Sequence, residues 1–379
     1  MFEAIVNGLS GLGTGFVSLH WSNLVMIAVG GLLLYLGIKK DVEPLLLVPI
    51  GFGAVLINIP LADLMGDEGF LRVIYNMGIA NELFPLLIFI GIGAMTDFGH
   101  LLENPKIFLL GAAGQFGIFL TIGLALIFGF PKLDAVAIGI IGACDGPTAI
   151  YVTSKYAPHL LGAVSVAAYS YMSLVPVIQP PIMRLMTSQK ERTLVMKPKT
   201  KPVSQTAKIV FPIVVTVIGG LIAPKGLPLI GTIMLGNLLK ECAVVSRLTK
   251  ASENEIANVV TLFLGISIGA TMDGKLFLTP TTLLILGFGF LAICLDTVCG
   301  VLFGKLMYLL TGGKINPLIA AAGISAYPMA ARVVQKEGQK YNKLNFLLMH
   351  AVGANTGGQV GSVMAAAIML SVLHGMGII

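Results

Sequence analysis

The chain has 379 residues, of which 56% are hydrophobic and only 11% are charged, and its mean hydropathy is +0.92. Soluble domains carry roughly 25% charged residues, so this composition excludes a soluble protein and predicts an integral membrane protein built from helices. The net charge of +6 does not indicate nucleic-acid binding, because the Lys and Arg residues lie between apolar segments, where they set the orientation of a membrane protein.

Residues 1–19 lack a basic segment followed by a cleavage motif, so we expect an N-terminal segment and not a signal peptide. Six apolar segments follow, at 20–38, 44–61, 83–95, 107–130, 135–152 and 160–185. Residues 187–206 are the longest polar stretch, and they predict a cytoplasmic linker on the basis of Lys190, Arg192, Lys197, Lys199 and Lys201. Six further apolar segments lie at 209–223, 227–245, 256–270, 283–308, 317–334 and 344–373. We therefore expect two membrane repeats, at 20–186 and 207–379.

The two halves are similar in sequence. IGAMTD at 92–97 returns as IGATMD at 268–273, and PLLLVPIGFG from Pro44 is similar to PLIGTIMLGN from Pro228. GACDGPTA likewise matches GISAYPMA, with Pro147 opposite Pro328. These matches occur in one order with offsets of 176 to 184 residues, which predicts an internal duplication. The alternative is that Gly-rich apolar segments look alike through composition alone.

Charge placement predicts that the repeats are inverted. Lys39 and Lys40 follow the first segment and the basic linker follows the sixth, so both places are expected in the cytoplasm. Because five segments lie between them, one segment must enter and leave on the same face, and 135–152 has a helix-breaking centre, GACDGPT. Residues 317–334 are the matching hairpin. The sequence thus predicts an all-α polytopic membrane protein: two inverted repeats with about ten transmembrane helices and two re-entrant hairpins or broken helices that meet near the midplane.

Asp145 lies inside an apolar segment, where a carboxylate costs roughly 2.5–3.5 kcal/mol. An acidic residue at such a place is therefore expected to have an interaction partner or a functional role that offsets this cost. Gly146 and Pro147 free backbone carbonyls beside it, and Thr148 adds a hydroxyl, which together predict an oxygen site for Na⁺ or a proton relay. The alternative is a structural Asp that caps a half-helix.

A second polar group lies in HAVGANTGGQVGSV, where Asn355, Gln359 and Ser362 follow the i, i+4, i+7 spacing of one helix face. Gly358 lies on the same stretch and allows close backbone approach. This neutral face can complete a Na⁺ shell, or it can supply ordinary interhelical hydrogen bonds. Tyr171 occupies the position of Asn355 in the first repeat and offers an oxygen ligand or a proton donor, although a Tyr in a membrane protein also serves as an interfacial anchor.

Three other acidic residues carry weaker predictions. Asp97 and Asp273 end the two copies of the IGA motif and are expected to cap helices. Asp296 lies within an apolar segment and is expected to pair inside the bundle.

GACDGPTAIYVTSKY, SYMSLVPVIQPP and HAVGANTGGQVGSV resemble motifs of the β subunits of the sodium-pumping, biotin-dependent decarboxylases, and the resemblance covers nearly the whole chain. That family comprises membrane subunits of oxaloacetate, methylmalonyl-CoA, glutaconyl-CoA and malonate decarboxylases, and the short N-terminus looks more like the acyl-CoA members. The resemblance implies that the chain decarboxylates carboxybiotin, consumes a proton and exports Na⁺. It implies as partners a carboxyltransferase (alpha) subunit, a biotin carrier subunit and a small membrane (gamma/delta) subunit.

The resemblance also implies roles for particular residues. Catalytic roles fall to Asp145 and Tyr171, and Na⁺ binding falls to Asp145, Asn355, Gly358 and Ser362, to which the residue chemistry above adds Thr148. The ion itself is expected at Asp145, Asn355 and Ser362. Some members carry an Arg after this Ser, whereas VMAAAIMLSVL here has none, which removes a cationic anchor for carboxybiotin at that place. We expect a homo-oligomer in the cytoplasmic (inner) membrane of a bacterium, with no nucleic-acid partner. The competing hypothesis, which topology and charge leave open, is a secondary transporter such as a Na⁺/H⁺ antiporter or a Na⁺-coupled carboxylate symporter.

Overall fold

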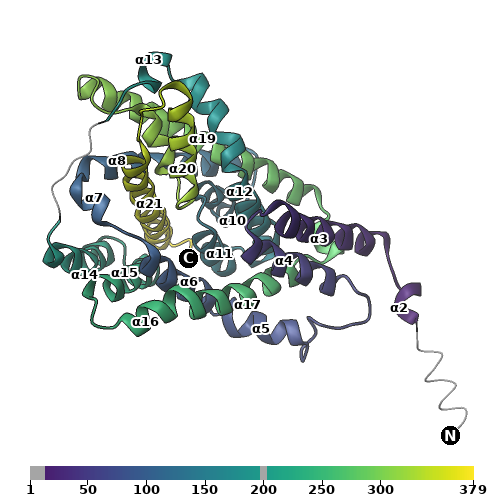
Figure 1. Ribbon diagram of the computed structural model, residues 1–379. Helices are drawn as coiled ribbons and strands as arrows, with labels where there is room; N and C mark the ends of the chain where they lie inside the picture. The colour runs from purple at the N-terminus through teal and green to yellow at the C-terminus, as the bar shows by residue number, and fades with distance from the viewer. Residues whose placement is uncertain (1–12, 197–202) are drawn as a thin grey trace, which may run out of the picture.

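The computed structural model describes residues 13–196 and 203–379, and the regular secondary structure of these residues is entirely helical (Figure 1). Residues 1–12 of the expected N-terminal segment lie outside the described residues, and so do residues 197–202 of the expected linker, with Lys197, Lys199 and Lys201. Six described helices are long and apolar enough to cross a membrane, or seven if the bent pair α5 and α6 counts as one span. The prediction of an all-α polytopic membrane protein is confirmed at this level.

The first half of the chain contains the following helices: α2 (Thr14–Val17), α3 (Trp21–Lys40), α4 (Pro44–Ile57), α5 (Phe70–Gly78), α6 (Leu83–Met95), α7 (Gly99–Glu103), α8 (Pro105–Gly114), α9 (Phe116–Ile127), α10 (Lys132–Gly139), η1 (Ile140–Ala143), α11 (Gly146–Tyr156), η2 (Pro158–Leu160) and α12 (Leu161–Met186). The expected segment 135–152 is α10, η1 and the start of α11. Its course is therefore a broken helix with an irregular tip.

The second half contains α13 (Gln189–Arg192), α14 (Gln205–Ile222), η3 (Pro224–Gly226), α15 (Leu227–Cys242), α16 (Ser246–Ala251), η4 (Ser252–Ile256), α17 (Ala257–Ala270), α18 (Gly274–Phe277), α19 (Pro280–Leu310), η5 (Pro317–Gly323), α20 (Met329–Tyr341) and α21 (Leu348–Gly375). The expected segment 317–334 is η5 and the start of α20. Every other expected segment also contains a helix. However, α4, α6, α15 and α17 have only 13 to 16 residues, fewer than the roughly 20 that a perpendicular span needs.

These four short helices pack as two crossed pairs, α4 on α17 and α6 on α15, each joining the two halves of the chain. Glycine makes both crossings close. A Cβ on Gly53 would lie 2.4 Å from the carbonyl oxygen of Ile266, and a Cβ on Gly236 would lie 2.0 Å from that of Ile90. Since no side chain fits at these points, the Gly-rich composition serves direct backbone contact.

Elements at matching sequence offsets make matching contacts. Besides the crossed pairs, α12 packs on α19 as α21 packs on α8, and α3 packs on α4 as α14 packs on α15. The repeated IGA motif ends in the same way in both copies. The amide of Asn58 donates to the carbonyl of Met272 (2.8 Å), and the amide of Asn237 donates to that of Thr96 (3.2 Å). This packing supports the duplication that the sequence predicts.

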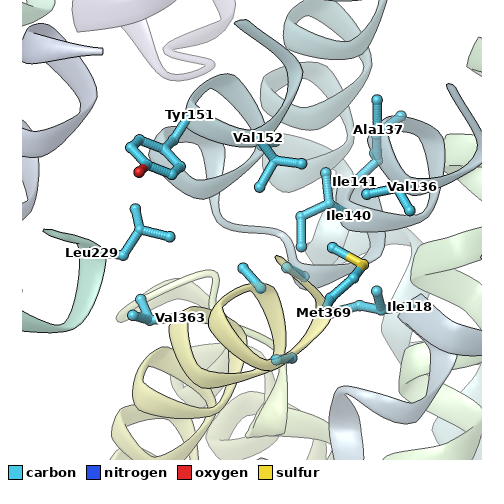
Figure 2. Packing of buried hydrophobic residues seen from close by; sticks show 14 of the residues in the cluster. Ile118, Val136, Ala137, Ile140, Ile141, Tyr151, Val152, Leu229, Val363 and Met369 are labelled. Carbon is cyan, nitrogen blue, oxygen red and sulfur yellow. The ribbon is translucent and has the colours of Figure 1, made fainter. Parts of the chain in front are cut away.

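The two broken segments, 135–152 and 317–334, are called the first and the second hairpin below, and they meet in the interior. The backbone N–H of Ser325, just after η5, donates to the carbonyl of Ala143 at the end of η1 (3.1 Å). In Figure 1, α10 and α11 lie at the centre, between α14 and α15 on the left and α3 and α4 on the right. Figure 2 shows the apolar cluster around the first hairpin, where Val363 and Met369 of α21 share a core with Ile140 of η1 and Val152 of α11.

Candidate functional site

Asp145 lies at the tip of the first hairpin, and the backbone on either side explains its position. Cys144 ends η1 in the left-handed region (φ 51°), Asp145 is extended, and Pro147 occupies the first turn of α11. Proline lacks an N–H and suits the first turn of a helix, where that N–H would have no partner. The GACDGPT sequence thus ends one helical segment and begins another, and it leaves the Asp145 side chain at the junction.

The Asp145 carboxylate is 3% exposed and accepts hydrogen bonds from three neutral side chains. The hydroxyl of Thr148 donates at 2.7 Å, the hydroxyl of Ser362 at 3.0 Å and the amide of Gln359 at 3.4 Å, all to Oδ2. The backbone N–H of Thr148 also approaches Oδ1 at 3.5 Å, so the residue is the N-cap of α11 as well. Helix capping and a polar site coexist at this carboxylate.

α21 connects this carboxylate to the second hairpin. Its residues Gln359 and Ser362 reach Asp145, whereas Asn355, further toward the N-terminus of α21, donates to the carbonyl of Ile324 (2.6 Å). The carbonyl of Gly358 accepts from the hydroxyl of Ser325 (2.9 Å). The predicted polar face of α21 is therefore real, but its two ends serve different hairpins. The structure does not bring Asn355 to Asp145.

Tyr171 faces α19 and not the Asp145 carboxylate. Its hydroxyl donates to the carbonyl of Leu286 in α19 (2.7 Å), and its ring packs edge-on against Phe290. The tyrosine that faces the tip of the first hairpin is Tyr169, two residues earlier, and the sequence interpretation missed it. The signal was present: residues i and i+2 of a helix do not share a face, so only one of these two tyrosines can lie near Asp145.

A cavity of about 370 Å³ lies beside Asp145, Tyr169 and Gln359. Its lining includes six polar residues drawn from both hairpins and from α12, α17 and α21: Asp145, Tyr169, Thr261, Ser325, Tyr327 and Gln359. Carboxylate, hydroxyl and amide oxygens are the ligands that hard cations prefer. The rest of the lining is mostly apolar, so the ligands for a small cation are these polar groups around Asp145.

The family model described as "Na+-transporting oxaloacetate decarboxylase beta subunit" matches residues 22–373. The chain belongs to this family. It is 52% identical over 360 residues to methylmalonyl-CoA decarboxylase subunit beta of Veillonella parvula (95% of each chain), and 52% identical over 362 residues to glutaconyl-CoA decarboxylase subunit beta of Acidaminococcus fermentans (96% of each chain). It is 44% identical over 425 residues to the oxaloacetate decarboxylase beta chain of Klebsiella pneumoniae (96% of this chain and 98% of that one). The predicted family is confirmed.

This β subunit therefore functions as the membrane subunit of a Na⁺-transporting decarboxylase. The family assignment favours that function over the secondary transporter that topology and charge left open. All relatives reported above are decarboxylase subunits, and all match over nearly their full length.

A second cavity, of about 540 Å³, lies among α3, α4, α12 and α20 of the β subunit. Its lining contains more basic than acidic residues: Lys40, Arg332, Lys336 and Lys340 against Asp41, Glu43 and Glu337. On its lining, the Glu337 carboxylate is 1% exposed and accepts from Arg184 of α12 at 2.6 and 3.0 Å. Burial raises the pKa of Glu337, but the hydrogen bonds from Arg184 and Lys340 outweigh it and hold that pKa below its ordinary value.

The remaining acidic residues are placed as follows. Asp273 accepts from the N–H of Lys275 (2.9 Å) and caps the start of α18, as predicted. Asp97 accepts from the N–H of Gly99 (2.8 Å), the first residue of α7, but the N-cap position of that helix is occupied by Phe98. Asp296 lies against Gly117 and Gly142, and the backbone N–H groups of Gly117 and Ile118 interact with its carboxylate. Its contacts inside the bundle are thus with backbone groups, in a geometry short of a complete hydrogen bond. The glycines on both sides leave no room for a second side chain.

Proposed function

We propose that the chain decarboxylates carboxybiotin presented by a separate biotin carrier subunit and uses Asp145 to exchange Na⁺ for the proton that this reaction consumes. The single observation that carries the proposal is the Asp145 carboxylate, buried at the junction of two hairpins with three neutral donors. Such donors stabilise a carboxylate but do not neutralise it. Uptake of Na⁺ or of H⁺ does, and because one carboxylate takes either ion, the two compete.

Chemical balance requires such an exchange. Carboxybiotin is an N-carboxylate anion; its C–N bond breaks to release CO₂, and one proton is taken up by the ureido nitrogen. A proton that leaves Asp145 for this reaction frees the carboxylate for Na⁺. Exporting one positive charge against 100 mV costs about 2.3 kcal/mol, so the exchange must be closed when no carboxybiotin is present.

We assign Na⁺ binding first to Asp145, Thr148 and Ser362, because the hydroxyl oxygens of Thr148 and Ser362 each lie within hydrogen-bond distance of Oδ2 of Asp145. Asn355 and Gly358 remain proposed ligands through their contacts with the second hairpin. The catalytic role of Tyr171 also remains a proposal; its contact with α19 supports an indirect role, through the position of that helix.

We further propose the complete topology of inverted repeats 20–186 and 207–379, with ten spans, two re-entrant hairpins and a cytoplasmic linker at 187–206. The matching contacts of the two halves support it, and so does the meeting of the hairpins at Ala143 and Ser325. In transporters of this architecture the site lies where the hairpins meet. In this topology the short helices α4, α6, α15 and α17 cross the membrane where it is locally thinner than the average bilayer.

The cavity lined by Lys40, Arg332, Lys336 and Lys340 lies on the side that this topology places in the cytoplasm. Its volume is within the range of small-molecule sites, about 300–1,000 Å³, and its cations suit the carboxylate of carboxybiotin. These side chains supply the anchor that is missing after Ser362. We accordingly propose as partners a carboxyltransferase (alpha) subunit, a biotin carrier and a small membrane (gamma/delta) subunit, in a homo-oligomer in the bacterial cytoplasmic membrane.

The test combines partner capture with one substitution. Purification of the chain with its complex should bring down a subunit that avidin detects, and a lone secondary transporter would bring none. In reconstituted vesicles, Asp145→Asn should abolish both carboxybiotin decarboxylation and Na⁺ uptake, because Asn neither neutralises Na⁺ nor carries the exchanged proton. Asp273→Asn, at a helix cap outside the site, is the matched control. Decarboxylation without transport would restrict Asp145 to the ion path, and full activity would remove it from the mechanism.

A further inference from the structure

Tyr169 contributes a buried hydroxyl to the cavity at Asp145. The residue is 2% exposed, and within residues 13–196 and 203–379 its hydroxyl forms no hydrogen bond. A buried hydroxyl without a partner is costly, and it lines the same cavity as Asp145 and Gln359. This hydroxyl is aimed at the site and is not used by the packing around it.

Its ring lies directly over the residue that follows Asp145. A Cβ added to Gly146 would lie 2.1 Å from Cε1 of Tyr169, 2.2 Å from Cζ and 2.5 Å from the hydroxyl oxygen. The phenol end of the side chain, and not its Cβ end, is therefore the part in contact with the hairpin tip. Tyr169 and Asp145 are also close enough to interact electrostatically. Gly146 is required here because a larger residue would displace this ring.

We propose that the hydroxyl oxygen of Tyr169 is a ligand of the Na⁺ bound at Asp145, and that Tyr171 is not. This inference rests on the proposed function. A neutral phenol suits that position because its oxygen has lone pairs for a cation while its O–H can donate to the carboxylate. It joins the hydroxyl of Thr148 and that of Ser362 around one carboxylate. Tyr171, by contrast, already donates to Leu286.

The two tyrosines permit a matched experiment, in which the thermal unfolding of the purified protein in detergent is titrated with Na⁺ and choline keeps the ionic strength constant. Tyr169→Phe removes a buried oxygen that has no partner, so its midpoint without Na⁺ should be no lower than that of the wild type. Its half-saturating Na⁺ concentration should rise at least about tenfold, equivalent to about 1.4 kcal/mol. Tyr171→Phe should do the opposite: a lower midpoint without Na⁺ and an unchanged half-saturating concentration. The Na⁺ dependence of decarboxylation by the reconstituted complex should shift in parallel.

The other possible results of this titration distinguish the role of Tyr169 from the Na⁺ site itself. If Tyr169→Phe titrates as the wild type does, Tyr169 is not a ligand, while the proposed Na⁺ site at Asp145 stands. If Tyr169→Phe fails to fold or unfolds earlier without Na⁺, its hydroxyl has a structural partner and the inference is wrong. A wild type whose stability and activity ignore Na⁺ overturns the proposed function and this inference with it.

Discussion

Replacing Gly236 by Ala is expected to destabilise the protein at one point, the crossing of α15 over α6. The new Cβ would lie 2.0 Å from the carbonyl oxygen of Ile90 and 2.8 Å from the N of Ala94. Both atoms belong to the backbone, so no rotamer change relieves the contact, and the helices must separate by about 1.5 Å to reach ordinary contact distance. Overpacking of this kind typically costs about 1–3 kcal/mol.

Gly231 lies on the same helix and is the control. A Cβ there meets nothing within 4 Å, and Ala is the better helix former by about 1 kcal/mol. Gly231→Ala should therefore raise the midpoint of thermal unfolding in detergent, followed by circular dichroism, whereas Gly236→Ala should lower it. Gly93→Ala meets the carbonyl of Ile233 at 1.9 Å, from the other side of the crossing. Because one separation relieves both clashes, the double variant should lose less than the sum of the two single losses. Equal shifts at Gly236 and Gly231, or strict additivity, would refute the backbone contact.

Two further predictions concern the site and the cytoplasmic cavity. Ser362→Ala removes a 3.0 Å donor to Asp145 and should raise the Na⁺ concentration that decarboxylation requires about tenfold. Ser371→Ala, on the same helix, is the control. If the two variants require the same Na⁺ concentration, Ser362 is not a ligand. The pKa of Glu337 is held below 4.5, so its ion pair stabilises the folded state above that pH, and the stabilisation disappears as the pH falls through the lowered pKa. Glu337→Gln should accordingly unfold at a lower temperature than the wild type at neutral pH, and the difference should shrink in acid. A pH-independent difference would contradict it.

The helix break at Asp145 and the polar contacts of its buried side chain could be predicted because both depend on local sequence. GACDGPT breaks a helix wherever it lies, and an Asp in an apolar segment requires a reason. The crossed pairs could not be predicted in the same way. Their helices have 13 to 16 residues, and their close contacts join positions far apart in the chain, such as Gly53 and Ile266.

The sequence pointed to Tyr171, whereas the tyrosine at the hairpin tip is Tyr169, and the reason is geometric. Counting along the repeats aligned Tyr171 with Asn355, but an alignment gives no information on how α12 is rotated about its own axis. Two residues on, a helical side chain points about 200° away, so Tyr171 meets α19 while Tyr169 meets the hairpin tip. Axial distance matters likewise for α21, because Asn355 and Ser362 are separated by about 10 Å of rise. One face of a helix is therefore not one site.

The duplication repeats the packing but not the chemistry. Proline aligns with proline at the two hairpins, Pro147 with Pro328, yet the position of Asp145 is occupied by Ala326 in the second copy. The second hairpin contributes only neutral groups, such as the backbone N–H and the hydroxyl of Ser325. Two facing carboxylates would repel each other and favour a shared proton over Na⁺. A single carboxylate between two similar hairpins instead leaves one charge to neutralise, as the exchange of Na⁺ for H⁺ that we propose at this site requires.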